Sequence, residues 1–251
     1  MALVLMALPG PATAAAARQP LTGTFAYQIP PEPIAGALDA PARPRVLLTP
    51  TRDRIALLER PGLPPIGELA EPELRLAGLS VNPRNNAPSR SPTFSGIELR
   101  HLSTGETHRA QLPQGGRFMA IRWAPDGKHL ALLLLKEETV ELWTVEAATG
   151  RARRLASGVN AMFSLPFEWL GDGSGLLVRL VPGDRGRPPT APAVPAGPVI
   201  REAFGTAVRR QTIQNLLANA HDEALFEHYA TSRLTIVPVA GGGARPGGGA
   251  G

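Results

Sequence analysis

The stretch IRWAPDGKHLALLLL, residues Ile121–Leu135, decides the fold of this chain because it holds a complete strand–turn–strand unit. An apolar strand ends at Trp123, Pro125-Asp126-Gly127 form a tight turn, and a second strand starts at Leu130. Asp-Gly is typical of short hairpin turns, because glycine readily adopts the positive φ that a two-residue connection needs. The stretch therefore predicts a β-hairpin, which becomes informative if the unit recurs.

The unit recurs at a regular spacing. WLGDGSGLLVRL matches WAPDGKHLALLL with tryptophan, aspartate and glycine in register, and the two start at Trp169 and Trp123, which are 46 residues apart. A weaker copy, LTPTRDRIALLER, starts at Leu48. Further strands follow the hairpins and end in Thr-Gly, namely IELRHLSTG from Ile97 and VELWTVEAATG from Val140. Four strands repeated about every 40–50 residues are the signature of a β-propeller blade.

The repeat predicts a mainly β fold: a partial β-propeller of about three four-stranded blades, of the TolB or WD40 type, with a small helical insertion. An ordinary meander with coincidental turns is the alternative. Closed propellers use about four to eight blades, so we expect a piece of a ring with an apolar face open at each end and marginal stability alone. The expected parts are a signal-like segment (1–17), an N-terminal extension (18–45), the partial propeller (46–239) and a flexible glycine-rich tail (240–251).

Helical spacing interrupts the third blade at about residues 209–230. Ile213, Leu216 and Leu217 share one helical face, and Ala224–Tyr229 belong to a second segment that His221-Asp222 would cap. The outer strand of the blade, in SRLTIVPVAGG, follows this insertion. Between the first and second blades, a shorter helical turn is expected within residues 67–77, in a stretch too rich in proline and glycine for a standard blade strand.

The first residues resemble the later part of a secretory signal. Leu3–Leu8 form a short apolar run and Ala14–Ala17 offer small residues for cleavage, although a charged region ahead of them is missing. We therefore expect a secreted or periplasmic protein, with an alanine-rich end of no targeting role as the alternative. No apolar run is long enough to span a bilayer.

Composition excludes several classes of function. The chain lacks cysteine, which excludes disulfides and thiolate chemistry. Its net charge of +5 comes from scattered arginines without a basic helix face or interleaved aromatic residues, so a nucleic-acid partner is not expected. The 27 glycines and 27 prolines favour many short elements joined by turns over long helices.

The same residues resemble the N-terminal part of serine peptidases of the prolyl oligopeptidase class, in particular the glutamyl endopeptidase-like group. The most specific stretches are LPPIGELAEPELRLAG from Leu63 and DEALFEHYATSRL from Asp222. The resemblance runs from about Tyr27 to Val239 and includes further matching residues: Pro30-Pro31, Ile34, Asp39-Ala40-Pro41, Asn82, Ser89-Arg90, Gly96, Trp123, Pro125-Asp126-Gly127, Phe163, Trp169, Pro188-Pro189, Pro195 and Gly197-Pro198.

This resemblance implies that a propeller caps an α/β-hydrolase domain which lies C-terminal to it and carries a Ser-Asp-His triad. The propeller of such peptidases restricts access, so that peptides reach the serine and folded proteins do not. The full-length form would hydrolyse peptide bonds, with cleavage after acidic residues as one option, and a peptide would be its substrate. The hydrolase domain is expected but missing from this sequence, which leaves the enzyme assignment of the chain itself open.

The sequence offers no nucleophile of the expected kind. A serine hydrolase of this class needs a Gly-x-Ser-x-Gly elbow, and the nearest string, Gly171–Gly175, places Ser174 one position late inside a predicted hairpin turn. The five histidines are interpreted as surface residues, and the carboxylate pairs as solvated ends: His101, His108, His129, His221, His228, Glu137-Glu138 and Asp222-Glu223. We therefore expect no catalytic, cofactor-binding or metal-binding residue and no cofactor. A free-standing TolB-like propeller that acts as a protein-interaction module is the alternative function.

Overall fold

The structure, a computed structural model, describes residues 30–192, 216–241 and 245–246 of the 251-residue chain. It divides into two compact units, Met1–Ala40 and Pro41–Gly251. In the first unit, helix α1 (Glu32–Asp39) begins after Pro31 and has a second proline in its first turn, where the missing N–H has no helical partner to lose. The sequence analysis did not predict this helix, and the signal-like segment (1–17) lies outside the described residues.

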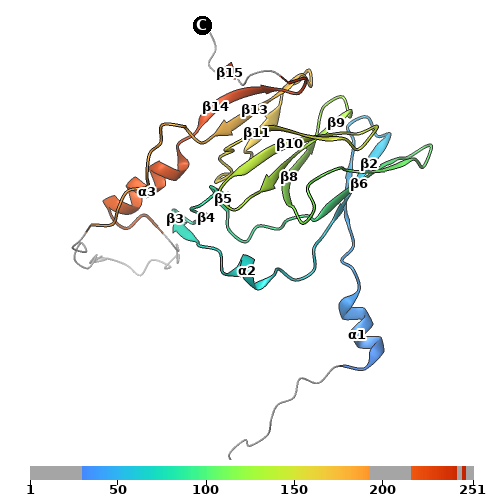
Figure 1. The fold of residues 1–251 in the computed structure, drawn as a ribbon, viewed down its shortest axis with the longest axis horizontal. Helices are drawn as coiled ribbons and strands as arrows, with labels where there is room; N and C mark the ends of the chain where they lie inside the picture. Colours follow the sequence, from blue (N-terminus) through green and yellow to red (C-terminus); the bar gives the residue numbers. More distant parts are fainter. Residues whose placement is uncertain (1–29, 193–215, 242–244, 247–251) are drawn as a thin grey trace, which may run out of the picture. The chain divides into compact units, whose positions relative to one another are not determined.

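Three four-stranded antiparallel sheets form the second unit, in which each strand pairs with the next one named (Figure 1). The first sheet contains β1 (Arg45–Leu48), β2 (Arg54–Glu59), β6 (Gly96–His101) and β7 (Thr107–Arg109). The second contains β8 (Arg117–Trp123), β9 (His129–Leu135), β10 (Val140–Glu146) and β11 (Ala152–Ser157). The third contains β12 (Phe167–Trp169), β13 (Gly175–Leu180), β14 (Arg233–Pro238) and β15 (Arg245–Pro246). These sheets confirm the predicted fold class, a mainly β partial propeller of three four-stranded blades.

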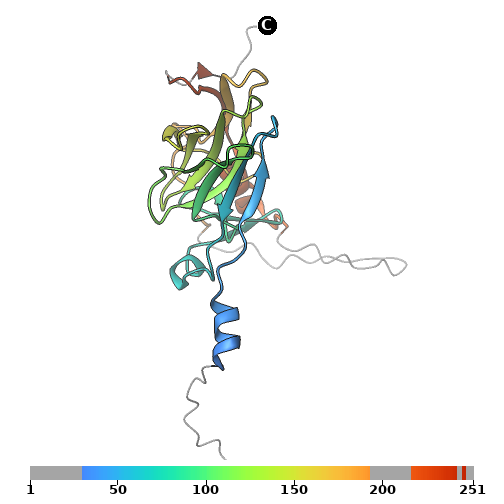
Figure 2. The same cartoon turned by 90° about the vertical axis from the view of Figure 1, so that its right-hand side faces the viewer.

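The second sheet packs between the other two, and β9 explains why. Leu130, Leu132 and Leu134 are buried in the apolar cluster shared with the first sheet. Ala131, Leu133 and Leu135 are buried in the cluster shared with the third sheet. Because successive side chains of a strand point to opposite faces, a strand between two sheets needs a continuous apolar run. The run LALLLL therefore identifies β9 as a strand of the middle sheet, which is covered by another sheet on each face. Figure 2 shows the strands of these sheets running side by side.

The repeated tryptophans link each sheet to the one before it. Trp123 Nε1 donates a hydrogen bond to the carbonyl oxygen of Leu47 in β1, over 3.2 Å. Trp169 Nε1 donates in the same way to the carbonyl oxygen of Arg122 in β8, also over 3.2 Å. Leu47 and Arg122 hold equivalent positions, one residue before the end of the first strand of each sheet. Each contact places the indole ahead of the turn between its own sheet and the preceding one.

The hairpin turns differ in detail from the expected two-residue connection. The amide of Gly127 donates to the carbonyl of Ala124 over 3.0 Å, and Ala124 in turn donates to His129 over 2.8 Å, which makes the loop four residues long. Only the glycine has a positive φ, 69° at Gly127 and 71° at Gly173, whereas a two-residue type I′ turn needs two such residues. In the first sheet Arg52 takes the glycine's place with a φ of 59°.

Two long connections lie at the opposite end of the sheets from these turns. The one between β2 and β6 holds helix α2 (Ile66–Leu69) and a small sheet of β3 (Leu74–Leu76), β4 (Leu79–Asn82) and β5 (Ala87–Pro88). The helical turn expected within residues 67–77 is thus present at its start, but residues 74–76 form a strand instead. Pairing with Leu79–Val81 satisfies the backbone N–H and C=O groups of that strand, and a local sequence pattern does not predict such pairing.

The other long connection, between β13 and β14, holds helix α3 (Ala220–Ala230), which confirms a helical segment inside the third blade. Its N-cap is Asn219, whose side chain accepts a hydrogen bond from the amide of Asp222, so the cap lies ahead of the expected His221-Asp222. Leu216 precedes the helix together with Leu217, contrary to the expected first helical face. Residues 209–215 lie outside the described part of the chain, so the extent of the insertion stays a prediction.

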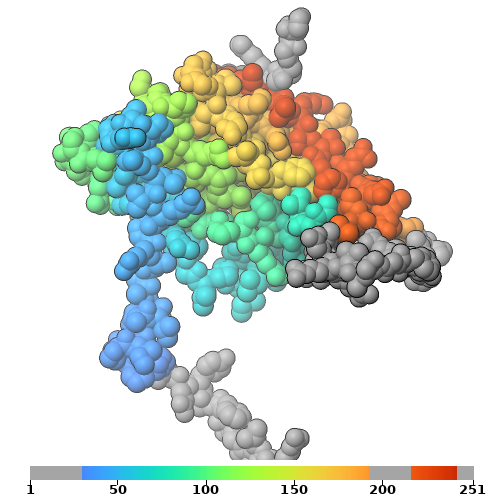
Figure 3. Space-filling model, turned by 180° about the vertical axis from the view of Figure 1, so that it is seen from behind, coloured from blue at the N-terminus to red at the C-terminus, as the bar shows by residue number. Residues whose placement is uncertain are grey.

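Helix α3 packs against the small sheet and thereby joins the two long connections (Figure 3). Their shared apolar cluster contains Leu76 and Val81 from the small sheet, Met162 from the loop before β12, and Tyr229 from α3. Within the expected tail, Arg245-Pro246 form β15 beside β14, a backbone pairing that side-chain pattern does not predict. No helix among the described residues is long and apolar enough to cross a membrane.

Candidate functional site

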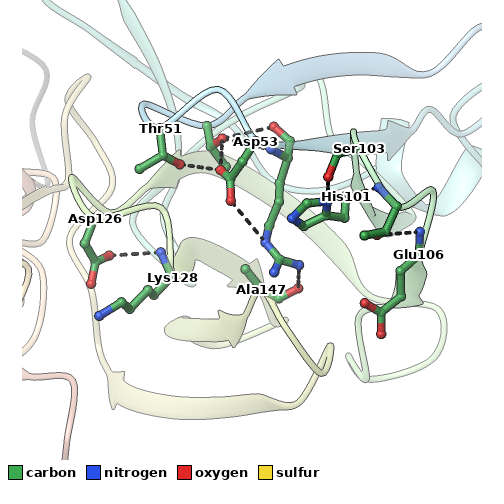
Figure 4. A network of polar contacts seen from close by, with 11 residues as sticks. Thr51, Asp53, His101, Ser103, Glu106, Asp126, Lys128 and Ala147 are labelled. Atoms are coloured by element: carbon green, nitrogen blue, oxygen red, sulfur yellow. Dashed lines mark hydrogen bonds and ion pairs between the residues drawn. The ribbon is translucent and has the colours of Figure 1, made fainter.

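The turn end of the sheets carries a network of polar side chains (Figure 4). Asp53 accepts hydrogen bonds from Thr51 and, over 3.0 Å, from Thr49. The hydrogen bond from Thr51 is the main reason why the pKa of Asp53 lies below its usual value. Arg54 reaches from the first sheet to the carbonyl oxygen of Ala147 in the second, over 3.4 Å. These groups pair with one another and fix the hairpins, so we interpret this network as structural.

Several residues that the sequence analysis considered for a chemical role make local contacts within their own turns or at a helix start. Ser174 donates its hydroxyl hydrogen to Asp172 over 2.8 Å within the third hairpin, as its place in the repeat predicts. His101 contacts Ser103 over 3.1 Å, and His108 contacts Glu106 over 2.9 Å. Asp222 accepts from the amide of Ala218 and belongs to the start of α3, while Glu137 pairs with Arg84 on the surface.

His228 differs from these residues, because it is half-buried and part of its ring is shielded from solvent. Its Nε2 atom is buried without a hydrogen-bond partner among the described residues, and its ring meets the ring of Tyr229 edge-on, with centroids 4.9 Å apart. Burial, and after it the guanidinium of Arg185, lowers the pKa of His228 below 6.5. The carbonyl oxygen of Tyr229 accepts hydrogen bonds from both Asn86 (2.9 Å) and Asn160 (2.8 Å). These two bonds connect the end of α3 to the residue before β5 and to the loop before β12.

A cavity of about 450 Å³ lies beside α2 and is a candidate for a binding site. Three separate segments line it: the stretch from Arg60 through α2, the connection Arg90–Ser95, and the residues Gly115–Arg117 that lead into β8. Its volume falls in the range of about 300–1,000 Å³ that ligand sites usually have. Apolar rings and side chains form much of the lining, contributed by Pro61, Pro64, Pro65, Leu69, Pro92 and Phe94.

Three arginines and one carboxylate supply the charge of this cavity, which we call the α2 cavity. Arg117 pairs with Glu68 over 3.4 Å and with Glu71 over 2.9 Å, and only 25% of its side chain is exposed. Arg90 pairs with Glu73 over 3.4 Å. Arg60 is exposed at the cavity and forms no ion pair with the carboxylates of the described residues.

A second cavity of about 350 Å³ shares Gly115 and Arg117 with the first. Glu71 lines it, accepts a hydrogen bond from Asn82 in β4 over 3.0 Å and pairs with Arg117 in β8. Glu71 therefore links the small sheet to β8. Sequence reasoning singled out the stretch from Leu63 but assigned it no role. The signal that could have found the cavity is weak, because its lining comes from three distant segments.

The residues that the structure describes contain no group of three or more histidine and carboxylate side chains placed to hold a metal ion.

The chain is similar in sequence to two curated proteins. It is 35% identical over 230 residues to a probable glutamyl endopeptidase, chloroplastic, of Arabidopsis thaliana, and 34% identical over 231 residues to the protein of the same name from Oryza sativa subsp. japonica. Each alignment covers 86% of this chain and 24% of the relative. The chain is homologous to the N-terminal region of the glutamyl endopeptidases. It spans about a quarter of their length, and no family model matches it.

Among solved structures, TolB from Acinetobacter baumannii is similar over 87% of this glutamyl endopeptidase homologue and 45% of TolB, with a TM-score of 0.32 and 15% sequence identity. The homology confirms the resemblance stated from the sequence. It also corrects the expected localisation: the relatives are named as chloroplastic proteins, which contradicts a secreted or periplasmic assignment. The short apolar run that suggested a signal is a weak indicator, because alanine-rich ends of many kinds contain such runs.

Proposed function

We propose that this chain is the non-catalytic propeller part of a serine-type peptidase. The homology to glutamyl endopeptidases over most of the chain is the observation that carries this proposal. The sequence contains no Gly-x-Ser-x-Gly elbow, so the nucleophile would come from a hydrolase domain that is not part of this chain. The propeller part would limit access to that domain, so that peptides are cleaved and folded proteins are not.

The outward faces of the first and third sheets support this proposal. On the first sheet, the cross-strand pairs Val46–Leu57 and Leu48–Ile55 face away from the second sheet, with Val46 55% exposed and Leu48 50% exposed. On the third sheet Leu234 is 47% exposed. Apolar sheet faces of this kind are stable when a further sheet covers them. We infer that additional blades pack on both faces in the whole protein.

The repeated tryptophan contact suggests how a following blade would dock. Glu168 holds the position in β12 that Leu47 and Arg122 hold in the first two sheets. Its carbonyl oxygen is therefore placed to accept a hydrogen bond from the tryptophan of a fourth blade, as the other two carbonyl oxygens do. The same stacking geometry would then continue around the ring.

A serine-directed label tests the non-catalytic assignment. The purified 251-residue chain is incubated with a fluorophosphonate probe and with chromogenic peptides, beside an intact glutamyl endopeptidase as the positive control. We expect labelling and turnover for the intact enzyme and neither for the chain. Covalent labelling of Ser174, or of any other serine of the chain, contradicts the assignment.

A chimera tests the role in access. The matching region of the Arabidopsis relative is replaced by this chain, and hydrolysis of a short peptide is compared with hydrolysis of a folded protein that contains the same peptide. We expect the chimera to keep its preference for the short peptide. Equal rates on both substrates would contradict the proposed gating. The homology to proteins named as peptidases favours this role over that of a free-standing TolB-like interaction module.

A further inference from the structure

A third cavity, of about 640 Å³, lies between the second and third sheets near their turn end, and we call it the intersheet cavity. In the α2 cavity, Arg90 and Arg117 are held in ion pairs, whereas the arginines of the intersheet cavity pair with no carboxylate of the described residues. We propose that the intersheet cavity binds a small organic phosphate through its phosphate group. This proposal is independent of the proposed function, because it needs no hydrolase domain.

The intersheet cavity is open because an arginine of the first sheet has no counterpart in the second. Between the first and second sheets, Arg54 at the start of β2 donates to the carbonyl oxygen of Ala147 over 3.4 Å. His129 holds the corresponding position at the start of β9, and Val239 holds the position of Ala147. An imidazole is shorter than an arginine side chain. The space that Arg54 fills in the first gap therefore stays open in the second.

Thr144 adds a hydroxyl without a partner to this cavity. Its residue in β10 pairs with Ala131 and Arg153 on the face toward the third sheet, and it is only 4% exposed. The corresponding residue of the first sheet is Leu99, which is buried in an apolar cluster. The Oγ1 atom of Thr144 is buried and has no hydrogen-bond partner among the described residues. Such a hydroxyl is unfavourable unless a ligand meets it, which a rotation of the side chain would allow.

Two arginines supply the positive charge of the cavity. Arg151 and Arg153 are two residues apart along one strand direction, so their side chains leave the same face of the sheet, and both are exposed. Arg153 donates to the carbonyl oxygen of Ala240 over 3.3 Å, a neutral partner that leaves its charge unbalanced. The carboxylate of the lining, Glu146, accepts a hydrogen bond from Thr149 over 2.7 Å. The two guanidinium groups are therefore available to an anion.

The donors and the volume favour an organic phosphate. A phosphate monoester has three terminal oxygens and about two negative charges, and guanidinium groups bind such oxygens through paired hydrogen bonds. Arg151, Arg153 and the hydroxyl of Thr144 offer enough donors for all three oxygens, whereas a carboxylate has two. The volume lies within the range of about 300–1,000 Å³ that ligand sites usually have, which is more than a free phosphate ion needs. Val239 and Ala240 offer the remainder of the ligand an apolar wall.

Four small molecules separate the phosphate group from the body that carries it. Isothermal titration calorimetry measures how phenyl phosphate, inorganic phosphate, benzoate and phenol bind to the 251-residue chain at one ionic strength. We expect phenyl phosphate to bind most tightly, and benzoate about 10-fold more weakly because it makes fewer charge-assisted hydrogen bonds. Inorganic phosphate should also bind about 10-fold more weakly, because it lacks the apolar contact. Phenol should not bind measurably.

Charge-matched variants place the phosphate in the cavity. Arg151→Gln and Arg153→Gln are each expected to weaken binding of phenyl phosphate about fivefold, since each removes a charged donor at an exposed position. Arg45→Gln removes an exposed arginine from β1, outside the cavity, and should leave the affinity unchanged. Glu146→Gln removes the negative charge of the lining and should strengthen binding about threefold. The unfolding midpoint of every variant is measured to verify that it folds.

Thr144→Val separates binding from stability. It removes the buried hydroxyl and keeps the shape of the side chain, so we expect an unfolding midpoint no lower than that of the unchanged chain. Binding of phenyl phosphate should nevertheless weaken about threefold, because one hydrogen bond to the ligand is lost. A purely structural role of Thr144 would give the opposite pattern, with a lower midpoint and an unchanged affinity.

Several results overturn the proposal. Equal affinity for phenyl phosphate and benzoate removes the preference for phosphate, and equal affinity for phenyl phosphate and inorganic phosphate removes the organic ligand. Equal effects of Arg153→Gln and Arg45→Gln remove the cavity as the place of binding. Because binding is measured without turnover, these results are separate from the labelling test of the proposed function.

Discussion

The two ends of the sheets are built on different principles. At the turn end the three hairpins repeat one backbone geometry, with a residue of positive φ at Arg52, Gly127 and Gly173. At the opposite end the connections share nothing: the second sheet has a short turn from Lys136 to Thr139, whereas long insertions follow β2 and β13. The repeat therefore maintains the stack, and the insertions are where this chain differs from a plain propeller and where the α2 cavity lies.

The difference also concerns the kind of interaction at each end. Turn-end contacts are short-range hydrogen bonds within a hairpin or between adjacent hairpins. Insertion-end contacts join residues that are distant in sequence, such as Asn86 with Tyr229 and Arg185 with Asn86. Substitutions at the turn end should lower the stability of the whole stack. Substitutions at the insertion end should act locally, on α2, the small sheet or α3.

The largest expected effect is at the tryptophan contact. Trp123→Ala removes the hydrogen bond to Leu47 and the packing of the indole between the first and second sheets. We expect the free energy of unfolding to fall by about 3 kcal/mol, as for other large aromatic residues replaced by alanine. Urea unfolding followed by fluorescence or circular dichroism measures it. Trp169→Ala should give a similar loss. A large difference between the two variants would contradict the structural equivalence of the two tryptophan contacts.

A pair of glycines compares the two ends directly. Gly150 lies in a turn-end hairpin with a φ of 71°, and an added Cβ would come within 2.5 Å of the carbonyl oxygen of Arg109. Gly78 lies in the small sheet with a φ of 80°, and its added Cβ would meet open space. Both alanine variants carry the cost of the left-handed conformation, about 1–2 kcal/mol. Gly150→Ala must also displace the backbone of the first sheet.

We therefore expect Gly150→Ala to lose more than about 2 kcal/mol of unfolding free energy and Gly78→Ala to lose about 1 kcal/mol. Both are measured by urea unfolding under one set of conditions. Equal losses would show that the close approach of Gly150 to Arg109 makes no contribution, and that the two ends tolerate substitution alike.

Arg117 tests whether the insertion end responds locally. Arg117→Gln breaks the ion pairs with Glu68 and Glu71, which hold α2 and the residues after it against β8. We expect a loss of about 1 kcal/mol or less in global stability, because the pairs are partly exposed. Hydrogen exchange should accelerate in α2 and β3 and stay unchanged in β9. Faster exchange in β9 would mean that the ion pairs support the stack itself.

Much of the fold follows from the sequence because its signals are local. The Trp–Asp-Gly units and the run LALLLL fixed the strands of the second sheet and most strands of the other two. The small sheet and β15 escaped prediction because they are held by backbone pairing with other segments. Helix α1 was missed although its first turn carries a local signal, a proline. The interpretation of the turn as a two-residue connection failed because Asp-Gly fits several loop lengths.

The candidate site was less predictable than the fold. The α2 cavity needs Arg60, Arg90 and Arg117 to come together, and no spacing in the sequence relates them. The environment of His228 was hard to predict for a similar reason: the adjacent Tyr229 is held by Asn86 and Asn160, which lie in other elements. Ser174, in contrast, lies in the hairpin turn that its place in the repeat predicts, because its contacts are within its own hairpin.

The smallest expected effect concerns pH at the insertion end. Burial and Arg185 lower the pKa of His228 in the folded state below the ordinary value of 6.5. The fold therefore holds the neutral ring, while the unfolded chain takes up a proton at the ordinary pKa. The stability that depends on neutral His228 is fully present above pH 6.5 and is lost as the pH falls from 6.5 toward the folded-state pKa.

Hydrogen exchange of α3 at about pH 5.5 and about pH 7.5, corrected for the intrinsic exchange rate, measures this loss. We expect α3 to open more often at the lower pH and His228→Phe to remove the difference, because phenylalanine has no proton to gain. His101→Phe, at the turn end, is the matched control and should leave the pH dependence of α3 unchanged. If the pH dependence of exchange in α3 persists in His228→Phe, another group causes it. The two ends of the sheets would then not differ in the way proposed here for His228.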